Sequence, residues 1–344
     1  KNYIISYCSD NINCKYYNKF IIIQTYYYSK IMINIKRNDM ETPLNYEVVF
    51  NTLVEETENY ISSNKIKSMV LGISGGIDST VVASICCEVS KNTGIPLIGR
   101  SLSIKNKEDE YNSSILVGQT FCSDFKSLNL YETYTHLTTD LKLLENTLEN
   151  TDISEGNIQA RLRMIYLYNI ASITKGIVMS TDNQTEYQLG FWTIHGDVGD
   201  FDPLQDLWKT EVYKLAEWIK DNYSSQIKEK GDFFDQATKA ISESMKLIPT
   251  DGLGISNSDL EQIGANSYEE VDKILQEFFK FCKFSLILNK EDNMKSFIES
   301  FTIKNINTEV IKKVLNRHIT SEFKRKKSPI FIKRNKYENH IINH

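Results

Sequence analysis

The chain of 344 residues has few of the features that mark zinc-binding or membrane-spanning proteins. Its six cysteines include no C-x-x-C pair, and its five histidines have no zinc-finger spacing, which excludes the common cysteine–histidine zinc motifs. No apolar run approaches the roughly 18 residues that a membrane-spanning helix needs. We therefore expect reduced thiols in a cytoplasmic protein with no membrane partner.

The chain also lacks an excess of basic residues. Its 40 lysines and arginines are outnumbered by 45 aspartates and glutamates, so the net charge is −5. A nucleic-acid-binding domain usually carries a basic patch, and the basic run at 324–327 is too short to form one. We expect no nucleic-acid partner. The remaining composition, 41% hydrophobic and 25% charged, is that of an ordinary globular protein.

Residues 69–83 combine a strand, a glycine turn and the start of a helix. Residues 69–73 are apolar, which is typical of a short buried strand, and Ser74, Gly75 and Gly76 follow them. The glycines permit positive φ and a close approach of backbone to ligand, while the free N–H groups of a helix's first turn favour an anion such as phosphate. The Walker A pattern G-x-x-x-x-G-K-[ST] is absent from this segment.

Alternating strand and helix patterns predict an α/β fold, a Rossmann-like parallel sheet with helices on both faces and a helical C-terminal part. We expect one sheet containing strands near residues 68–73, 97–102, 127–132 and 176–180. Helices are expected at 43–62, 108–122, 135–149, 155–175, 210–222 and 308–322. Thr42 and Pro43 are predicted as the N-cap and first residue of the helix at 43–62, and Gly176 as the left-handed residue that ends the helix at 155–175. Such sheets bind ligands where the strands end, which is where residues 74–79 lie.

The N-terminal segment differs from the remainder of the chain. Residues 1–39 are dominated by Lys, Asn, Tyr and Ile without a clear period, and Met40 precedes the first predicted helix. We expect residues 1–39 to be a disordered or non-native extension, with a small hairpin as the alternative. A single domain is expected over residues 40–334, followed by a tail at 335–344.

The Ser-Gly-Gly-x-Asp-Ser sequence at 74–79 resembles the signature of the PP-loop, or N-type ATP pyrophosphatase, superfamily, which has an adenine nucleotide alpha hydrolase-like fold. Members cleave ATP between the α and β phosphates. Four blocks in order are similar to ammonia-dependent NAD synthetases: residues 71–80, 156–164, 180–209 and 321–329. The strings T-D-N-x-x-E at 181–186, H-G-D-x-G-D at 195–200 and L-x-K-T at 207–210 are characteristic of that family.

This resemblance implies ATP-dependent amidation of deamido-NAD by ammonia in a homodimer, giving NAD, AMP and pyrophosphate through an acyl adenylate. It implies that Asp78, Glu186 and Lys209 are catalytic, with Asp78 and Glu186 as ligands of Mg²⁺. It implies ATP contacts from Gly72, Ile73, Ser74, Gly75, Gly76, Ile77, Asp78, Ser79, Thr181, Lys209 and Thr250. It implies deamido-NAD contacts from Arg161, Asp200 and Lys324.

The chemistry of this family suits these residue types. A carboxylate is a poor electrophile, so it must first attack the α-phosphorus of ATP and acquire AMP as a leaving group. Because both reactants are anions, Mg²⁺ and Lys209 can lower the barrier by neutralising charge that develops on the pyrophosphate. Arg161 can hold a phosphate or carboxylate with its planar fork.

Each of these residues also has a structural interpretation. Arg161 on a helix is commonly a surface ion-pair partner, Asp200 beside a glycine a turn residue, and Glu186 a first-turn carboxylate that favours the helix dipole. The family often has Lys where Ile194 stands and His where Phe323 stands. The alternatives are therefore another PP-loop ligase, acting on xanthosine phosphate, aspartate or transfer-RNA bases, and a catalytically silent nucleotide-binding regulator.

The expected nitrogen source is ammonia. Glutamine-dependent relatives carry a separate glutaminase domain, and such a domain needs roughly 100 residues or more. Only 70 residues precede Leu71, and no histidine occurs before His136 to serve as a base for Cys8 or Cys14. We expect ammonium to support turnover and glutamine alone not to.

Overall fold

The computed structural model describes residues 44–144, 152–226, 232–249, 258–284, 290–300 and 306–326. Backbone contacts divide the chain into two units, Lys1–Leu44 and Asn45–His344, and the elements below belong to the second unit. The expected extension at 1–39, the tail at 335–344 and the predicted ATP contact Thr250 lie outside the described residues.

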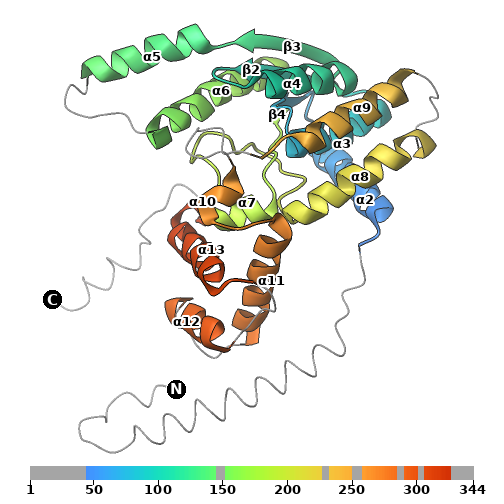
Figure 1. Cartoon of the computed structure of the whole chain (residues 1–344). Helices are drawn as coiled ribbons and strands as arrows, with labels where there is room; N and C mark the ends of the chain where they lie inside the picture. Colours follow the sequence, from blue (N-terminus) through green and yellow to red (C-terminus); the bar gives the residue numbers. More distant parts are fainter. Residues whose placement is uncertain are drawn as a thin grey trace, which may run out of the picture. The chain divides into compact units, whose positions relative to one another are not determined.

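Four parallel strands form one sheet in the order β3-β2-β1-β4 (Figure 1). The strands are β1 (Met69–Gly72), β2 (Leu97–Ser103), β3 (Asp124–Asn129) and β4 (Ile177–Val178). Met69 of β1 lies opposite Leu97 of β2 on one side and Ile177 of β4 on the other. The single parallel sheet confirms the predicted Rossmann-like α/β fold.

Helices cover both faces of the sheet (Figure 1). One face packs on α6 (Asp152–Thr174), with α5 (Tyr131–Leu144) beside it. The other face is covered by α2 (Tyr46–Ser63), α3 (Ile77–Thr93), α4 (Glu108–Phe121), α8 (Lys209–Gln226) and α9 (Asp232–Lys246). Alternate residues of β1 point to opposite faces, so Met69 and Leu71 enter one core and Val70 enters the other. Burial on both faces explains why β1 is apolar throughout.

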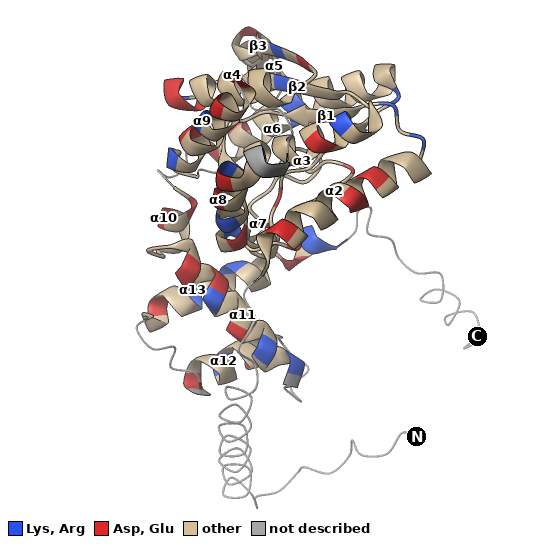
Figure 2. Ribbon diagram, turned by 90° about the vertical axis from the view of Figure 1, so that its right-hand side faces the viewer, with Lys and Arg blue, Asp and Glu red and all other residues tan. Residues whose placement is uncertain are grey.

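A second apolar core lies in the C-terminal part. It is built from α7 (Gln184–Leu189), α10 (Asp259–Ile263), α11 (Tyr268–Phe284), α12 (Lys290–Ser300) and α13 (Thr308–Thr320), followed by the short helix η1 (Glu322–Arg325). Basic and acidic residues are distributed together over α9, α11 and α13 (Figure 2). Within the described part of the chain, every helix is too short or too polar to cross a membrane.

Three predicted elements have other bounds in the structure. The first helix begins at Tyr46, and its N-cap is Asn45, whose side chain accepts a hydrogen bond from the Glu47 N–H at 3.1 Å. The predicted strand 127–132 is β3, which begins at Asp124 and ends at Asn129, and α5 replaces the predicted helix 135–149. Because β3 is an edge strand and mostly exposed, its residues have no apolar alternation that would locate it in the sequence.

The end of α6 also differs from the prediction. Lys175, with φ of 54°, takes the left-handed conformation that was assigned to Gly176. Gly176 instead allows the backbone to pass close to Ser68, because a Cβ at this position would lie 2.6 Å from the carbonyl oxygen of Ser68. The strand predicted at 176–180 is only the two residues of β4. The Met179 N–H still donates to the Val70 carbonyl oxygen of β1 at 2.8 Å, and Met179 also bridges to Phe201.

Candidate active site

The glycine turn between β1 and α3 has the conformation that its sequence predicts. Gly75 has φ of +87°, and Gly76 is the N-cap of α3. The hydroxyls of Ser79 and Thr80 donate to the carbonyl oxygen of Gly76 at 3.0 and 2.9 Å, and the Gly76 N–H donates to Ser74 Oγ at 3.2 Å. These bonds hold the turn closed around the N-terminus of α3, a position that favours an anion.

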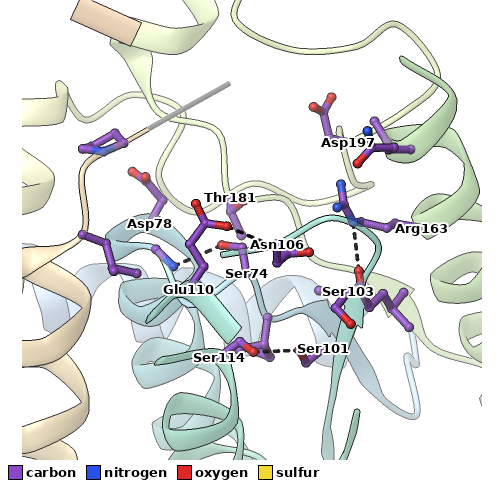
Figure 3. A pocket seen from close by; sticks show the side chains of 18 of the residues that line it. Ser74, Asp78, Ser101, Ser103, Asn106, Glu110, Ser114, Arg163, Thr181 and Asp197 are labelled. Carbon is purple, nitrogen blue, oxygen red and sulfur yellow. Dashed lines mark hydrogen bonds between the residues drawn. The ribbon is translucent and has the colours of Figure 1, made fainter. Parts of the chain in front are cut away.

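A cavity of about 400 Å³ opens beside this turn, at the carboxyl ends of the strands. Its size lies in the range of small-molecule sites. Side chains from four parts of the fold meet in it: Ser74 and Asp78 from the turn and α3, Ser103 and Asn106 from the end of β2, Arg163 from α6, and Thr181 and Asp197 from the segments after β4 (Figure 3). Figure 3 shows Arg163 and Asp197 across the cavity from Asp78. The cavity is where sheets of this class bind ligands.

The three residues predicted to be catalytic lie together in this cavity. The Lys209 ammonium is 2.5 Å from Asp78 Oδ2 and 2.9 Å from Glu186 Oε1. Lys209 is 1% exposed, while the Asp78 and Glu186 side chains are 16% and 17% exposed. Burial opposes a charge on Lys209, but the attraction of the two carboxylates outweighs it and raises the pKa of Lys209 well above its ordinary value. Lys209 is therefore a buried ammonium whose charge is stabilised by the carboxyl groups beside it.

Asn183 connects the Asp78 carboxylate to the start of α7, a role that was not predicted from the sequence. Its side chain is fully buried, and Nδ2 donates to Asp78 Oδ1 at 2.9 Å. Its Oδ1 accepts the Glu186 N–H at 3.0 Å, which makes Asn183 the N-cap of α7. The spacing Asn-x-x-Glu is the sequence signature of a capping box and could have identified this role. Glu186 is thus both a first-turn carboxylate, as its structural interpretation states, and a member of the site.

Asp78 and Glu186 could supply two of the ligands that a hard cation needs. Each presents one carboxylate oxygen to the same point, now filled by an ammonium. Two carboxylates, with phosphate oxygens and water, suit Mg²⁺. Among the described residues, His, Cys, Asp and Glu form no group of three or more that could hold a metal ion. A cation here would therefore depend on a phosphate ligand.

Other carboxyl groups near the cavity have raised pKa values. Asp182 is 8% exposed, and burial, together with repulsion from Asp197 and Asp202, raises its pKa well above the ordinary value. The Ser180 hydroxyl donates to Asp182 at 3.1 Å. Burial also raises the pKa of Asp202 to about 7. Burial is the main cause of both raised pKa values.

The predicted deamido-NAD contacts form a separate group around residues 190–200. Arg161 donates to the Ile194 carbonyl oxygen at 3.2 Å. Asp200 accepts the Tyr168 hydroxyl at 2.7 Å and the Val178 N–H at 3.2 Å. Lys324 donates to the carbonyl oxygens of Gly190, at 2.7 Å, and Trp192.

These three side chains lie outside the lining of the cavity in the described part of the chain. Phe323, which stands where the family often has His, is 55% exposed.

The predicted ATP contacts divide into two groups. The following residues line the cavity: Gly72, Ile73, Ser74, Gly76, Ile77, Asp78, Thr181 and Lys209. Gly75 and Ser79 do not line it and instead shape the turn. Arg163, Asp182 and the contact of Asn183 with Asp78 were not predicted, because they depend on distant chain segments that meet only in the folded protein.

The chain is similar in sequence to known NAD(+) synthetases. The chain is 27% identical over 293 residues to the glutamine-dependent NAD(+) synthetase of Aquifex aeolicus, covering 84% of this chain and 46% of that protein. It thus spans less than half of that relative. It is 29% identical over 291 residues to the NH(3)-dependent NAD(+) synthetase of Wolinella succinogenes, covering 84% of this chain and 97% of that protein.

The fold is also that of a solved relative. The structure of NMN synthetase from Francisella tularensis superimposes with a TM-score of 0.64 at 21% identity, covering 84% of this chain and 99% of that one. A family model described as NAD synthase matches residues 49–328, which include the sheet, the glycine turn and the Asp78–Glu186–Lys209 group. The chain therefore belongs to the NAD synthase family, the ATP-using ligases of NAD biosynthesis.

Proposed function

We propose that this chain amidates deamido-NAD with ammonia, giving NAD, AMP and pyrophosphate from ATP through an acyl adenylate. The observation that carries the proposal is the Lys209 ammonium, which lies between Asp78 and Glu186 in the cavity that the glycine turn also lines. It places a positive charge beside a helix N-terminus, a position that favours the phosphates of ATP. The family match supports the use of ATP.

Catalysis requires that the pyrophosphate leave with its charge compensated. The N–H groups at the start of α3 and the Lys209 ammonium lie on the same side of the cavity as Asp78. When ATP enters, Lys209 can exchange a carboxylate oxygen for a phosphate oxygen and so meet charge that develops in the transition state. The low exposure of Lys209 excludes water from this contact and strengthens it.

Mg²⁺ is part of this proposal. Asp78 and Glu186 would hold the ion, and Asn183 fixes the Asp78 carboxylate in position before the ion arrives. The bound ion would supply a Lewis acid that neutralises phosphate oxygens.

For deamido-NAD, Arg161, Asp200 and Lys324 are the proposed contacts. Arg161 and Lys324 now donate to main-chain carbonyl oxygens between residues 190 and 194. Asp200 accepts from the Tyr168 hydroxyl and the Val178 N–H, so substrate must replace or share these bonds. Arg161 and Lys324 are positively charged side chains near residues 190–194, where Ile194 replaces the lysine that the family often has. Phe323, in place of the family's histidine, is exposed and offers an apolar surface.

The proposed reaction is tested by its products. We expect AMP and pyrophosphate to form from ATP only when deamido-NAD and ammonium are both present, because adenylation requires the acid and release of AMP requires the amine. Chromatographic detection of AMP, ADP and NAD measures this. Since free ammonia is the nucleophile, the rate at subsaturating ammonium should rise from neutral to mildly alkaline pH.

A panel of alternative substrates distinguishes the proposed function from the two alternatives. A panel of xanthosine phosphate, aspartate and nicotinic acid mononucleotide should give no turnover comparable to that with deamido-NAD. Preference for one of these would assign another PP-loop ligase, and ATP binding without turnover of any would support a silent regulator. Equal rates with purified glutamine and with ammonium would contradict ammonia as the nitrogen source. Glutamine is included in the test because the similar Aquifex protein is a glutamine-dependent synthetase.

Substitution of Gly75 by alanine is expected to damage both stability and ATP binding. A Cβ at Gly75 would lie 2.6 Å from the Glu110 carbonyl oxygen and 2.7 Å from the Ser114 nitrogen, and φ there is +87°. Left-handed strain alone costs roughly 1–2 kcal/mol, and displaced backbone adds to it. Denaturant unfolding and ATP titration should show a loss of more than about 2 kcal/mol and more than tenfold in affinity.

Gly94, at the other end of α3, is the matched control. It has φ of +74°, but a Cβ there meets nothing within 4 Å. Gly94→Ala should therefore cost only about 1–2 kcal/mol of strain and leave ATP affinity unchanged. Equal ATP affinities for the two variants would show that the Gly75 turn does not contact the nucleotide.

We also propose that the protein is a homodimer. The resemblance to the family implies a two-fold cleft for deamido-NAD, and α6 exposes large apolar side chains, with Ile165 63% and Ile173 73% exposed. Light scattering at micromolar concentration should give twice the mass of one chain, and Ile165→Glu with Ile173→Glu should halve it. A fully active protein with the mass of one chain would refute the dimer.

A further inference from the structure

The helix that begins at Lys209 has no N-cap side chain that can accept hydrogen bonds, although Glu211 Oε2 in its first turn accepts the Trp208 N–H at 2.8 Å. Its N-cap position is Trp208, whose indole cannot accept hydrogen bonds from the free N–H groups of the first turn. Two of these groups, on Lys209 and Thr210, need acceptors from elsewhere in the fold. The sequence around residue 208 therefore leaves the start of α8 dependent on tertiary structure.

The missing acceptors come from two other helices. The Lys209 N–H donates to the Thr185 hydroxyl of α7 at 2.9 Å, and the Thr210 N–H donates to Asp272 Oδ2 of α11 at 3.0 Å. The Thr185 hydroxyl in turn donates to Asp272 Oδ1 at 2.5 Å. Both side chains are almost fully buried, with Thr185 1% and Asp272 2% exposed. One carboxylate thus caps α8 directly and through a hydroxyl.

These hydrogen bonds connect the two segments that carry Glu186 and Lys209. Thr185 immediately precedes Glu186, and Lys209 is the first residue of α8, so Asp272 connects the backbone segments that carry both. Tyr268, one turn before Asp272 on α11, places its ring centroid 5.6 Å from the Lys209 ammonium. Helix α11 therefore contacts Lys209 near both its backbone and its charged end.

We propose that Asp272 is a positioning residue for Lys209, acting from the C-terminal helical part of the protein. Asp272 does not line the cavity, so it acts on ATP only through the placement of Lys209 and Glu186. Its negative charge at the N-terminus of α8 also interacts favourably with the helix dipole. Loss of this carboxylate frees the first turn of α8 and displaces the ammonium from its two partners.

The direct test of the cap is amide hydrogen exchange over residues 205–212. In Asp272→Asn we expect protection of the first turn of α8 to fall by more than about tenfold, because a buried donor loses its charged acceptor. Protection of α9 should stay unchanged. Glu269→Gln, which removes an exposed carboxylate from the same helix, is the control and should change neither segment. Unchanged protection in Asp272→Asn would overturn the inference, whatever reaction the protein catalyses.

The kinetic test rests on the proposed function. We expect Asp272→Asn to lower kcat about 10- to 100-fold per folded molecule with KM for ATP changed less, as a small misplacement of a catalytic group does. Because Asp272 acts through Lys209, the same substitution in a Lys209→Met background should change kcat less than about twofold. Equal fold losses in both backgrounds would show a general structural role and refute positioning. Absence of turnover by the unaltered protein would instead contradict the proposed function.

A second pair of variants covers the case in which Asp272→Asn does not fold. Thr185→Val removes the hydroxyl that links Asp272 to the Lys209 N–H, with little change in shape, and should lower kcat and α8 protection in the same direction. Thr185→Ser restores the hydroxyl and should recover both to near the level of the unaltered protein. Full activity and protection in Thr185→Val would refute the inference.

Discussion

Replacing Lys209 with methionine is expected to lower kcat by about 10²–10³-fold, the loss seen when one group that meets transition-state charge is removed. Methionine keeps the length and apolar body of the side chain, so the buried position stays filled. What is lost is the ammonium that lies between Asp78 and Glu186. Steady-state kinetics with saturating ATP, deamido-NAD and ammonium measure the effect.

The same variant should bind Mg²⁺ more tightly before nucleotide is added. In the unaltered protein the ammonium occupies the point where Asp78 Oδ2 and Glu186 Oε1 converge, so an incoming cation must displace it. Without it, the two carboxylates repel each other and attract a divalent ion. Calorimetric titration with Mg²⁺ alone should therefore show a higher affinity, although activity has fallen. Lower affinity would mean that the two carboxylates do not form the cation site.

Lys214→Met is the control for this substitution. Lys214 lies on the same helix, α8, and is exposed. Its replacement should leave both kcat and Mg²⁺ affinity within about twofold, as surface changes usually do. A full loss of activity in this control would attribute the Lys209 effect to α8 as a whole.

Replacing Asp78 with asparagine is expected to reduce kcat/KM for ATP by more than about 10³-fold, because a metal ligand and a partner of Lys209 are lost together. Asparagine can still accept the Asn183 bond through its oxygen, but its amide then points donors at the Lys209 ammonium. Glu186→Gln should act in the same direction, while preserving the cap of α7 through its side-chain oxygen.

Folding must be followed in the same samples. Removal of one partner from a buried ion pair can cost 3–5 kcal/mol, but Lys209 keeps Glu186 and the carboxylates are partly solvated, so about 1–2 kcal/mol is expected for Asp78→Asn. Denaturant unfolding measures this. Asp221→Asn, an exposed carboxylate beside Lys220, is the matched control and should change neither stability nor activity. Activity within tenfold of the unaltered protein in both Asp78→Asn and Glu186→Gln would remove the two residues from the site.

The sequence by itself determined the local features of the nucleotide turn. An apolar segment, two glycines and a helix start can form only a few structures, because glycine alone takes φ of +87° without strain and a buried parallel strand must be apolar on both faces. The order of strands and helices likewise predicted a parallel sheet, since each strand is followed by a helix. Where this local signal is weak, as in the exposed edge strand β3, the prediction was displaced by three residues.

Only the tertiary structure decided which residues act together. Asp78 and Lys209 are 131 residues apart, and Asp272 lies a further 62 residues beyond Thr210. No local pattern links them, because their contact depends on the order of the strands and on how α7, α8 and α11 pack. The same applies to the start of α8. Trp208 is an unfavourable N-cap residue, and the acceptor for the Thr210 N–H comes from Asp272 on another helix. Residue types carry the chemistry of this protein, and the packing of distant helices gives that chemistry its geometry.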